Sequence, residues 1–314
     1  MSDLEVLAAQ NGEPDILVSP YAPGWRVAAM QLPGVGTVSG KGPTGEAARI
    51  SCLAEAAEIL SLLARPDDRS FQGVDPHSEM QREFTPPEVA IINLSDPRDL
   101  GTEGAAAGQT WDAAARGALL ERIERHAVAR WLTAEVQAKL LPETWYGSDI
   151  AENTLERART GSQTLRQTRF LVLEPLGPVW TIVALSQFAD GGAPITGAAA
   201  SEKVDEAVLG AISEMLQMEC SFALARIAKQ MGKETATHEK LFRRIASLES
   251  KATLWQPSQT QEFHGPSKPL GLRELAPSGA WLVDITREDI RIPVVRCVAP
   301  KLRSARVLQK FNQG

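Results

Sequence analysis

The amino-acid sequence predicts an α+β fold in which mixed or antiparallel β-sheets pack with several long helices. Segments rich in β-branched residues come in neighbouring pairs, at 25–40, at 170–188 and near the end of the chain. Long stretches with apolar residues at helical spacing lie between these pairs. Paired strands favour α+β, because a doubly wound parallel sheet would alternate single strands with helices.

The first half of the chain predicts two strands, a helix, an excursion and a further strand. Residues 25–40, WRVAAMQLPGVGTVSG, indicate two short strands around a Pro-Gly turn. A helix is expected from about Thr44 to Ala64. The polar, proline-rich residues around 65–88 predict a flexible excursion, and 89–95 predicts a strand.

The second half predicts four helices and two strand pairs. We expect helices at 111–140, at 150–158, from an N-cap at Ser201 onward, and at 234–250. The strands are expected at 170–177 with 179–188, joined by a turn at 176–178, and in the closing segments WLVDIT and IRIPVVRCVAP.

Length and composition exclude several classes of protein. The chain has 314 residues, and a hydrophobic fraction of 43% supports a substantial core, which we expect to form one domain over 1–314. A net charge of −6 gives no overall basic surface for non-specific nucleic-acid binding. The N-terminus carries Asp3, Glu5 and Glu13 where a signal peptide needs a basic start, and we expect no membrane span.

The cysteines and histidines show no metal-like spacing. The three cysteines, Cys52, Cys220 and Cys297, are far apart in the sequence, and the four histidines are scattered. We therefore expect a cytoplasmic protein without a structural zinc site.

Three of the expected helices share a local pattern centred on one glutamate each, namely Glu55, Glu121 and Glu214. Each has an alanine seven positions earlier and a glutamate or glutamine three positions later, which gives Ala48, Ala114 and Ala207 and then Glu58, Glu124 and Gln217. A glycine-bearing segment, interpreted as a loop, precedes every copy: GKGPTG, GAAAGQT and GAAAS.

This pattern has a chemical interpretation. Positions three apart lie on the same side of a helix, so each pair of polar residues can point at one ligand. Glycine-bearing loops that lead into helix N-termini favour phosphate. Carboxylates and phosphate need a bridging cation, and hard oxygen ligands suit Mg²⁺. The three elements together predict a nucleotide with its metal ions.

A solvated helix face is the alternative interpretation, because E-x-x-E is common on such faces and a glycine-rich stretch is a weak signal by itself. For the middle copy, the helical wheel puts Arg122, His126 and Ala129 on the solvent side. It puts Glu121 and Glu124 on another side, so these carboxylates are expected to be partly buried. A buried carboxylate needs a partner, such as Arg125 or a metal ion.

Four stretches, in this order, resemble the YcaO superfamily: SGKGPTGEAARISCLAEAAE, WDAAARGALLERIERHAVARWL, GAAASEKVDEAVLGAISEMLQ and AWLVDITREDIRIPVVRCVAP. The resemblance covers most of 39–302. It implies an ATP- and Mg²⁺-dependent enzyme that acts on backbone amides of a ribosomally made precursor peptide. A nucleophile adds to the amide carbonyl, ATP phosphorylates the resulting oxyanion, and phosphate leaves. A Cys, Ser or Thr side chain of the substrate gives an azoline, and an external sulfide gives a thioamide.

The resemblance also implies roles for individual residues. Arg125, in the family's E-x-x-E-R, would act as the catalytic group that neutralises phosphate charge. The implied metal ligands are Glu55, Glu58, Glu121, Glu124 and Glu214. The implied nucleotide-binding residues, in addition to Arg125, are Lys41, Ser51, Gln109 and Gln217.

Several positions depart from the family pattern. Ile59 and Glu219 stand where arginine is expected, Ala113 where glutamate is common, and His126 where aspartate is usual. The chain ends KFNQG, without the proline-rich tail of many azoline-forming members. These departures favour a partner-dependent or thioamide-forming member. They also keep open a different class, a non-catalytic YcaO-like scaffold that binds the precursor peptide or a partner enzyme.

Three further expectations concern partners and single residues. No obvious extra domain for a leader peptide is present, so we expect a separate leader-binding or accessory protein, and a homo-oligomer remains open. The mixed-charge helix HEKLFRRIASLESK is interpreted as a solvated face. Arg296 is either an edge-facing residue or a buried partner of a carboxylate.

Overall fold

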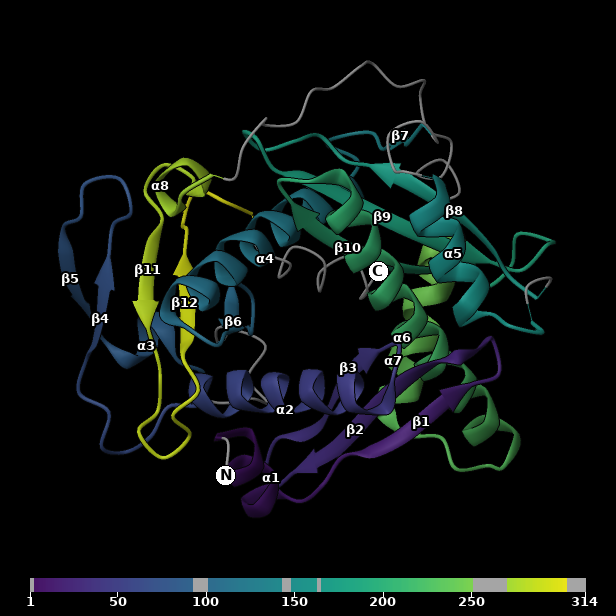
Figure 1. The fold of residues 1–314 in the computed structure, drawn as a ribbon, viewed down its shortest axis with the longest axis horizontal. Coiled ribbons are helices and arrows are strands. Elements are labelled where there is room, and N and C mark those ends of the chain that lie inside the picture. Colours follow the sequence, from purple (N-terminus) through teal and green to yellow (C-terminus); the bar gives the residue numbers. More distant parts are fainter. Residues whose placement is uncertain (1–2, 93–100, 143–147, 163–164, 251–269, 304–314) are drawn as a thin grey trace.

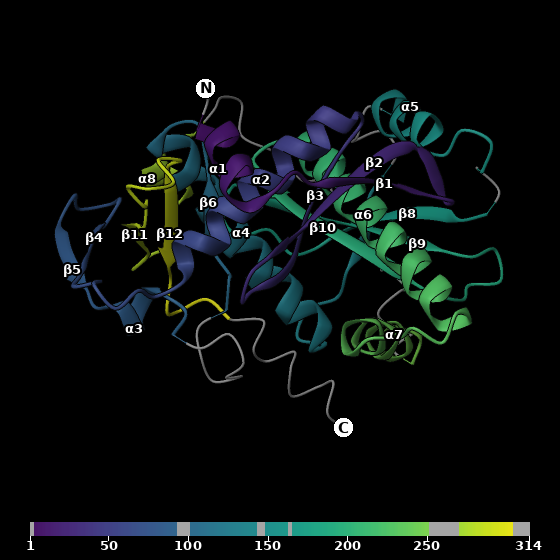
Figure 2. The same cartoon turned by 90° about the horizontal axis from the view of Figure 1, so that it is seen from below.

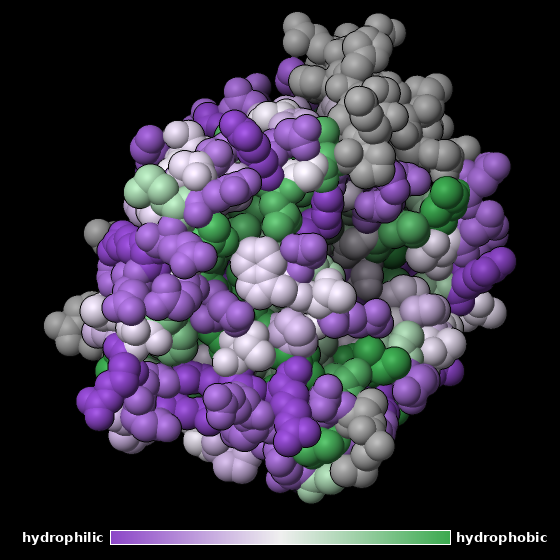
Figure 3. Space-filling view, turned by 60° about the vertical axis from the view of Figure 1, so that its left-hand side comes forward, coloured by the Kyte–Doolittle hydropathy of each residue, from purple (hydrophilic) through white to green (hydrophobic). Residues whose placement is uncertain are grey.

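The computed structural model describes residues 3–92, 101–142, 148–162, 165–250 and 270–303. Over these residues the chain forms three antiparallel sheets and eight helices (Figure 1). The predicted α+β class is confirmed. On the face in Figure 3, hydrophilic residues cover most of the surface and hydrophobic residues show mainly in recesses between them.

The N-terminal part of the chain forms a three-stranded sheet with the order β1-β2-β3. β2 and β3 are the predicted pair, and their Pro-Gly turn closes with a hydrogen bond from Val35 N to Leu32 O at 3.1 Å. Gly34 supplies the positive φ, 73°, that this turn requires. The elements are α1 (Asp3–Asn11), β1 (Asp15–Ser19), β2 (Ala22–Leu32), β3 (Gly36–Gly42) and α2 (Gly45–Leu62). α1 and β1 were not expected from the sequence.

The second sheet has four strands in the order β10-β9-β8-β7. β8 and β9 are the predicted pair, which turns at Gly177 with φ 60°. The strands are β7 (Lys139–Leu140), β8 (Gln167–Val172), β9 (Trp180–Gln187) and β10 (Ile195–Ser201). The accompanying helices are α5 (Ser148–Ala158), α6 (Val204–Gln230) and α7 (Ala236–Glu249).

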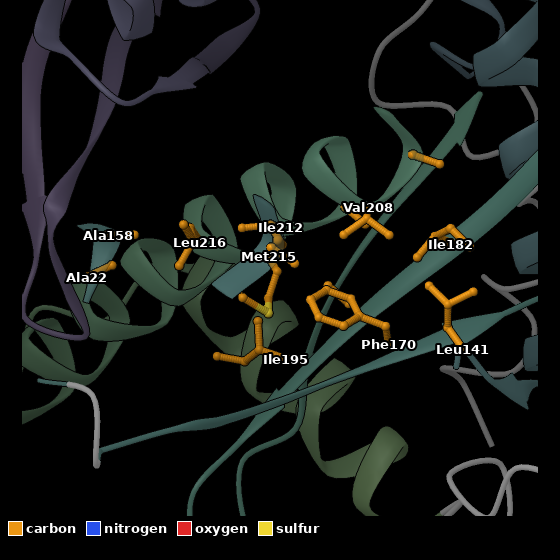
Figure 4. Packing of buried hydrophobic residues seen from close by; sticks show 14 of the residues in the cluster. Ala22, Leu141, Ala158, Phe170, Ile182, Ile195, Val208, Ile212, Met215 and Leu216 are labelled. Atoms are coloured by element: carbon orange, nitrogen blue, oxygen red, sulfur yellow. The ribbon is translucent and has the colours of Figure 1, made fainter. Parts of the chain in front are cut away.

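The largest core cluster lies between α6 and this second sheet. Figure 4 shows Val208, Ile212 and Met215 of α6 near Ile182 of β9 and Phe170 of β8. These side chains are at most 6% exposed. α6 is long and apolar enough, by length and composition, to cross a membrane, contrary to the expectation that no segment would be. Its apolar residues are accounted for by this packing, since 56% of the window concerned is buried inside the protein.

The third sheet has five strands in the order β5-β4-β11-β12-β6. It joins segments from both ends of the chain, as Figures 1 and 2 show. The strands are β4 (Phe71–Val74), β5 (Gln81–Phe84), β6 (Ala105–Ala107), β11 (Trp281–Asp284) and β12 (Val294–Val298). The helices are α3 (Pro86–Val89), α4 (Trp111–Leu132) and α8 (Leu272–Leu275).

The expected excursion at 65–88 is not an irregular loop, because it contains the β4–β5 hairpin and α3. β4 pairs with β11, more than 200 positions later, and no local pattern can reveal such a partner. The strand expected at 89–95 was also wrong in its first part. α3 ends at Val89, and Ile91 forms only an isolated bridge with Leu63. Residues 93–95 lie outside the described part of the chain.

Two helix boundaries differ from those expected. α4 ends at Leu132 rather than near Leu140, and Ala134 adopts a positive φ of 59°, which cannot continue a right-handed helix. Ser201 is the last residue of β10 and not a helix N-cap, a position that Lys203 occupies. α5 and α7 lie where 150–158 and 234–250 predicted them.

The glycine-bearing segments are largely strands, not loops. β3, β6 and β10 run into the N-caps of α2, α4 and α6, which are Thr44, Thr110 and Lys203. Each N-cap lies eleven positions before its central glutamate. At 1.5 Å per residue the helix N-terminus is about 16 Å from that glutamate. A phosphate bound near a central glutamate would therefore be out of reach of the N-terminus of that same helix.

The glycines instead allow each strand to cross its helix closely. The crossing pairs occupy equivalent positions in the three copies: Gly40 with Ser51, Ala106 with Gly117, and Ala199 with Gly210. A Cβ added at Gly40 would lie 2.5 Å from the backbone carbon of Ser51. One added at Gly117 or Gly210 would lie 2.9 or 2.7 Å from the Cβ of the facing alanine. One member of every pair is thus glycine, because a further Cβ would collide with the helix backbone at Gly40 and with the facing alanine Cβ at Gly117 and Gly210.

Candidate functional site

The three glutamate-bearing helices bring their carboxylates into one electrostatic cluster. α2, α4 and α6 border the centre of the molecule in Figure 1. Each glutamate of the cluster feels the charges of glutamates on other helices. The members are those that the sequence predicted: Glu55, Glu58, Glu121, Glu124 and Glu214.

Arg125 lies between the two glutamates of its own helix. Its Nε is 3.5 Å from Glu121 Oε1, and its Nη1 is 3.5 Å from Glu124 Oε1. The side chains of Glu121 and Glu124 are 24% and 9% exposed, so the predicted partial burial of these carboxylates is confirmed. Glu124 Oε1 is buried without a hydrogen-bond partner among the described residues. A buried carboxylate oxygen in this state has unused capacity for a ligand.

Hydrogen bonds to strand residues hold the other members in place. Glu58 Oε1 accepts the backbone N–H of Ala107 at 2.8 Å, which connects α2 to β6. Glu214 Oε2 accepts the backbone N–H of Ala198 at 3.4 Å, within the α6 and β10 pair. Gln217 Nε2 donates to Ser39 Oγ at 2.7 Å and connects α6 to β3.

Burial makes the carboxylates reluctant to ionise. It raises the pKa of Glu121 to about 7 and that of Glu124 to about 8, against the opposing charge of Arg125. Burial also raises the pKa of Glu55. The pKa of Glu58 is raised well above its usual value, by burial and by the nearby negative charge of Glu55. Five carboxylates thus share few compensating cations, and the arrangement favours added positive charge.

Comparison with known proteins shows the family of the chain. A family model described as YcaO cyclodehydratase, ATP- and Mg²⁺-binding, matches residues 97–303, about two thirds of the chain. The chain belongs to the YcaO family. No curated protein matches the sequence. The predicted cofactors, ATP and Mg²⁺, are those of the family.

Solved structures share the fold at low sequence identity. A YcaO protein from Methanopyrus kandleri, bound with AMPPCP and Mg²⁺, is 18% identical with a TM-score of 0.73, covering 99% of this chain and 94% of its own. A heterocyclase in complex with substrate and cofactor is 15% identical with a TM-score of 0.74 over 96% of this chain. This chain spans about half, 53%, of that heterocyclase. The E. coli microcin synthetase McbBCD complex matches at 13% identity and a TM-score of 0.66, covering 93% of this chain and 88% of that chain.

The residues predicted to hold the nucleotide differ in their proximity to the carboxylates. Lys41, on β3, has a charge that acts on Glu55, Glu58 and Glu124. Gln217 reaches β3 two residues before Lys41. Ser51 lies at the strand–helix crossing and is half-buried, whereas Gln109 is exposed in the turn before Thr110.

Two departures from the YcaO pattern lie away from the carboxylates. Ile59 is 8% exposed and packs in the apolar core with α1 and the first sheet. Glu219 is fully buried and forms ion pairs with Arg159 and Arg166, at 2.7 and 3.2 Å. Ala113, in contrast, is exposed at the start of α4, where Thr110 Oγ1 accepts its N–H.

The expected solvent side of α4 was wrong. Arg122 is 7% exposed and Ala129 is fully buried. The Arg122 guanidinium donates to the carbonyls of Leu302 and Arg303, at 2.5 and 2.7 Å, and His126 Nδ1 accepts the N–H of Arg303 at 2.8 Å. This side of α4 therefore binds a segment from the other end of the chain, which a helical wheel cannot show.

Arg296 is buried, which rules out the edge-facing alternative and confirms the burial, but not the carboxylate partner, of the other. It is 5% exposed and donates to the backbone carbonyls of Val89 at 2.8 Å and Gly101 at 2.7 Å. One neighbour of the carboxylate cluster was missed altogether. Arg244 of α7 has a charge that interacts with those of Glu214 and Arg125. Its surrounding mixed-charge sequence gave no signal, because its proximity to α4 and α6 depends on how α7 docks.

The residues present fit a nucleotide with Mg²⁺ better than a ready-made metal cage. Within the described ranges, no three His, Cys, Asp or Glu side chains are grouped closely enough to form a ligand set on their own. In nucleotide sites, Mg²⁺ usually takes one or two carboxylates and completes its shell with phosphate oxygens and water. The free hydrogen-bonding capacity of Glu124 Oε1 and the surplus of buried carboxylates suit that arrangement.

Proposed function

We propose that this protein is an ATP- and Mg²⁺-dependent enzyme that modifies backbone amides of a ribosomally made precursor peptide. YcaO family membership supports ATP-dependent peptide modification in general. The observation that carries the specific proposal is the cluster of five buried or half-buried glutamates around Arg125, in which Glu124 Oε1 has an ion pair with Arg125 but accepts no hydrogen bond from the described residues. Such a cluster costs folding free energy unless cations bind to it.

Each side chain then has a defined task. When bound, ATP supplies the phosphoryl group that turns the amide oxygen into a leaving group. Glu55, Glu58, Glu121, Glu124 and Glu214 would hold Mg²⁺, and Lys41 and Gln217 would help to hold the nucleotide. Arg125 would neutralise charge that develops on the transferring phosphoryl group. The raised pKa values of Glu121 and Glu124 imply that metal binding releases protons.

The same activation of the amide can lead to either of two products, depending on the nucleophile that adds to the amide carbon. Attack by a Cys, Ser or Thr side chain of the peptide, followed by loss of phosphate, gives an azoline. Attack by an external sulfide gives a thioamide. Mass spectrometry of a candidate peptide from the same gene neighbourhood distinguishes them. A cyclodehydration removes one water mass per modified residue, and thioamide formation adds the mass of sulfur minus oxygen.

The first test removes charge from two glutamates of α4 without changing their shape. Glu121→Gln and Glu124→Gln should lower peptide-dependent ATP hydrolysis by about a hundredfold or more, since these groups would act on the charge of the reacting phosphate. Glu152→Gln, at an exposed position on α5, is the matched control and should keep full activity. Undiminished hydrolysis in both α4 variants would overturn the proposal.

The alternative function is a scaffold that binds the precursor peptide or a partner enzyme without chemistry of its own. Ala113 favours it, because a carboxylate at this position could have supplied a further metal ligand. Ile59 and Glu219 no longer argue for it, because both side chains are engaged elsewhere. Calorimetry with MgATP separates the two functions. Absence of binding, with and without a partner protein, would favour the scaffold.

The proposed partners are a precursor peptide and a separate leader-binding or accessory protein. Solved structures of similar fold include a heterocyclase in complex with substrate and cofactor and the microcin synthetase McbBCD complex, which support such an assembly. The three buried free thiols are consistent with our placing the protein in the cytoplasm. A homo-oligomer stays a prediction, as does the single domain over 1–314. Co-purification from the native host tests the partner.

A further inference from the structure

Three edge strands face the carboxylate cluster. β3, β6 and β10 each stand at one end of the strand order of their sheet, and each runs into one of the three glutamate-bearing helices. The side chains of Glu58, Gln217 and Glu214 form hydrogen bonds with backbone groups of β6, β3 and β10 respectively. In Figure 1 the three strands and the three helices lie around the centre of the molecule.

Two of these bonds join one copy of the repeated pattern to the strand of another copy. Glu58, three positions after the central glutamate of α2, accepts the Ala107 N–H of β6 at 2.8 Å. Gln217, three positions after that of α6, donates to the Ser39 carbonyl of β3 at 3.2 Å. The contacts therefore run from α2 to the strand before α4, and from α6 to the strand before α2. A third contact, from Glu124 of α4 to β10, would complete the cycle.

This third contact is missing. Glu124 occupies the corresponding position of α4, and its Oε1 is buried. That oxygen lies 3.5 Å from Arg125 Nη1 but accepts no hydrogen bond from the described residues. α4 does pack against β10, because Ala198 contacts the apolar cluster that includes Ala127 of α4. The helix and strand of the third pair are therefore together, and only the polar link between them is absent.

The register of the second sheet shows which backbone groups of β10 are free. Thr181 O accepts the N–H of Leu173 at 2.9 Å, so the polar backbone groups of Thr181 point toward the β8 side of β9. Ala200 lies opposite Thr181, and its own N–H and C=O therefore point away from the sheet. Ala198, two positions earlier, points the same way, as its bond to Glu214 confirms. Among the described residues, none bonds to the Ala200 N–H or to the carbonyls of Ala198 and Ala200.

This free edge suits a peptide backbone better than a phosphate group. A donor and acceptors alternate along it, and a peptide amide supplies a partner for each. Phosphate oxygens could accept the N–H but would be repelled by the neighbouring carbonyl oxygens. Ala198, Ala199 and Ala200 are all half-buried, so solvent reaches the edge, and their methyl side chains leave room for a second backbone. An edge with only methyl groups recognises the backbone rather than particular side chains.

We propose that the β10 edge at Ala198–Ala200 binds the precursor peptide in an extended conformation, with the Ala200 N–H donating to a peptide carbonyl. This assignment rests on the proposed function, because it concerns the substrate of the same site. The missing third contact leaves a carboxylate oxygen on α4 for the metal and an N–H on β10 for the amide. The phosphoryl donor and the amide that receives it are thus held on two elements that pack together.

The first test removes the donor and keeps the strand. Ala200→Pro lacks the N–H, and an edge strand tolerates proline where that group points outward. In peptide-dependent ATP hydrolysis with a candidate precursor peptide from the same gene neighbourhood and its partner protein, kcat/KM should fall at least tenfold. The Kd of AMPPCP with Mg²⁺, from calorimetry, should stay within twofold of wild type. Ala200→Gly keeps the N–H and is the matched control, which should stay within threefold in both measurements.

The second test changes the peptide and leaves the protein intact. A series of precursor peptides, each N-methylated at one backbone amide beside the modified residue, removes single donors to the β10 carbonyls. Because alternate amides of a strand point in opposite directions, kcat/KM should fall at least tenfold at every second position and stay within threefold between them.

The outcomes separate this assignment from the proposed function. Undiminished kcat/KM in Ala200→Pro, or equal tolerance of every N-methyl position, overturns peptide binding at this edge. Loss of AMPPCP binding in Ala200→Pro also overturns it, because the edge would then serve the nucleotide. If Ala200→Pro does not fold, the N-methyl series decides alone. A wild-type protein without peptide-dependent hydrolysis overturns the proposed function and, with it, this assignment.

Discussion

Glu58 Oε1 accepts the backbone N–H of Ala107 at 2.8 Å, and this bond links α2 to the strand that leads into α4. A residue predicted as a metal ligand is therefore also a structural link between two of the three glutamate-bearing helices. Its two roles can be separated by substitution, because one depends on charge and the other on an acceptor oxygen.

Glu58→Gln keeps an oxygen that can accept the Ala107 N–H and removes the charge. Without metal we expect a melting temperature at or above that of wild type, since a buried charge is removed, and at least tenfold weaker Mg²⁺-dependent nucleotide binding. Glu58→Ala removes the acceptor as well and should lower the free energy of unfolding by about 1 kcal/mol or more. Urea unfolding and calorimetry on both variants check this. Equal destabilisation by the two substitutions would contradict the structural half of the prediction.

The pH dependence of stability follows from the raised carboxylate pKa values. In the unfolded chain Glu121 and Glu124 titrate near 4.5, and in the folded protein near 7 and 8. The folded state therefore binds more protons between these values, so stability should fall as the pH rises from about 4.5 to about 8. Melting curves in EDTA from pH 5 to pH 8.5 measure this fall.

A substitution and a bound ligand should each reduce this loss of stability at high pH. Glu124→Gln removes one titrating group and should raise the melting temperature at pH 8 relative to wild type. Mg²⁺ with nucleotide should stabilise most at high pH, where the carboxylates are ionised. A melting temperature of wild type that rises from pH 5 to pH 8 in EDTA would contradict the assigned direction of the shifts.

The strand–helix crossings predict which glycines cannot be replaced. A Cβ at Gly197 would lie 2.1 Å from Met215 N and 2.4 Å from Ala211 O, both backbone atoms of α6. Gly197→Ala should therefore destabilise by about 3 kcal/mol or more. Gly45→Ala is the control, since its nearest neighbour would be a side-chain atom at 3.9 Å. Denaturant midpoints of the two variants should differ clearly, and similar midpoints would argue against the close crossing.

Glu219 is predicted to be structural rather than catalytic. It lies between Arg159 and Arg166, and Ser186 Oγ also donates to its Oε1. Glu219→Ala would leave two buried guanidinium groups without their carboxylate, at a cost of about 3–5 kcal/mol. Equilibrium unfolding measures that cost. A stable Glu219→Ala protein that had lost nucleotide binding would instead point to a role in the site.

The repeated pattern made much of the site predictable from the sequence. Glu55, Glu121 and Glu214 share spacing because each strand and helix pair repeats the same local geometry, and such geometry leaves a signature in the chain. Hairpins such as β2–β3 were also predictable from a local pattern, because the Pro-Gly turn and its two strands follow one another directly in the sequence. The role of the glycines was not predictable, because glycine occurs both in phosphate-binding loops and at close strand–helix crossings. The residue type by itself does not distinguish the two.

The sequence by itself determined the α+β class, the three glutamate-bearing helices and their family. The tertiary structure alone decided that the β4–β5 hairpin joins β11, that Arg122 binds the 299–303 segment, and that Glu219 is paired away from the carboxylates. Each of these depends on residues distant in sequence that packing brings together. Local propensity and spacing carry no information about such a partner, because the free energy that selects it comes from burial and charge in the folded chain.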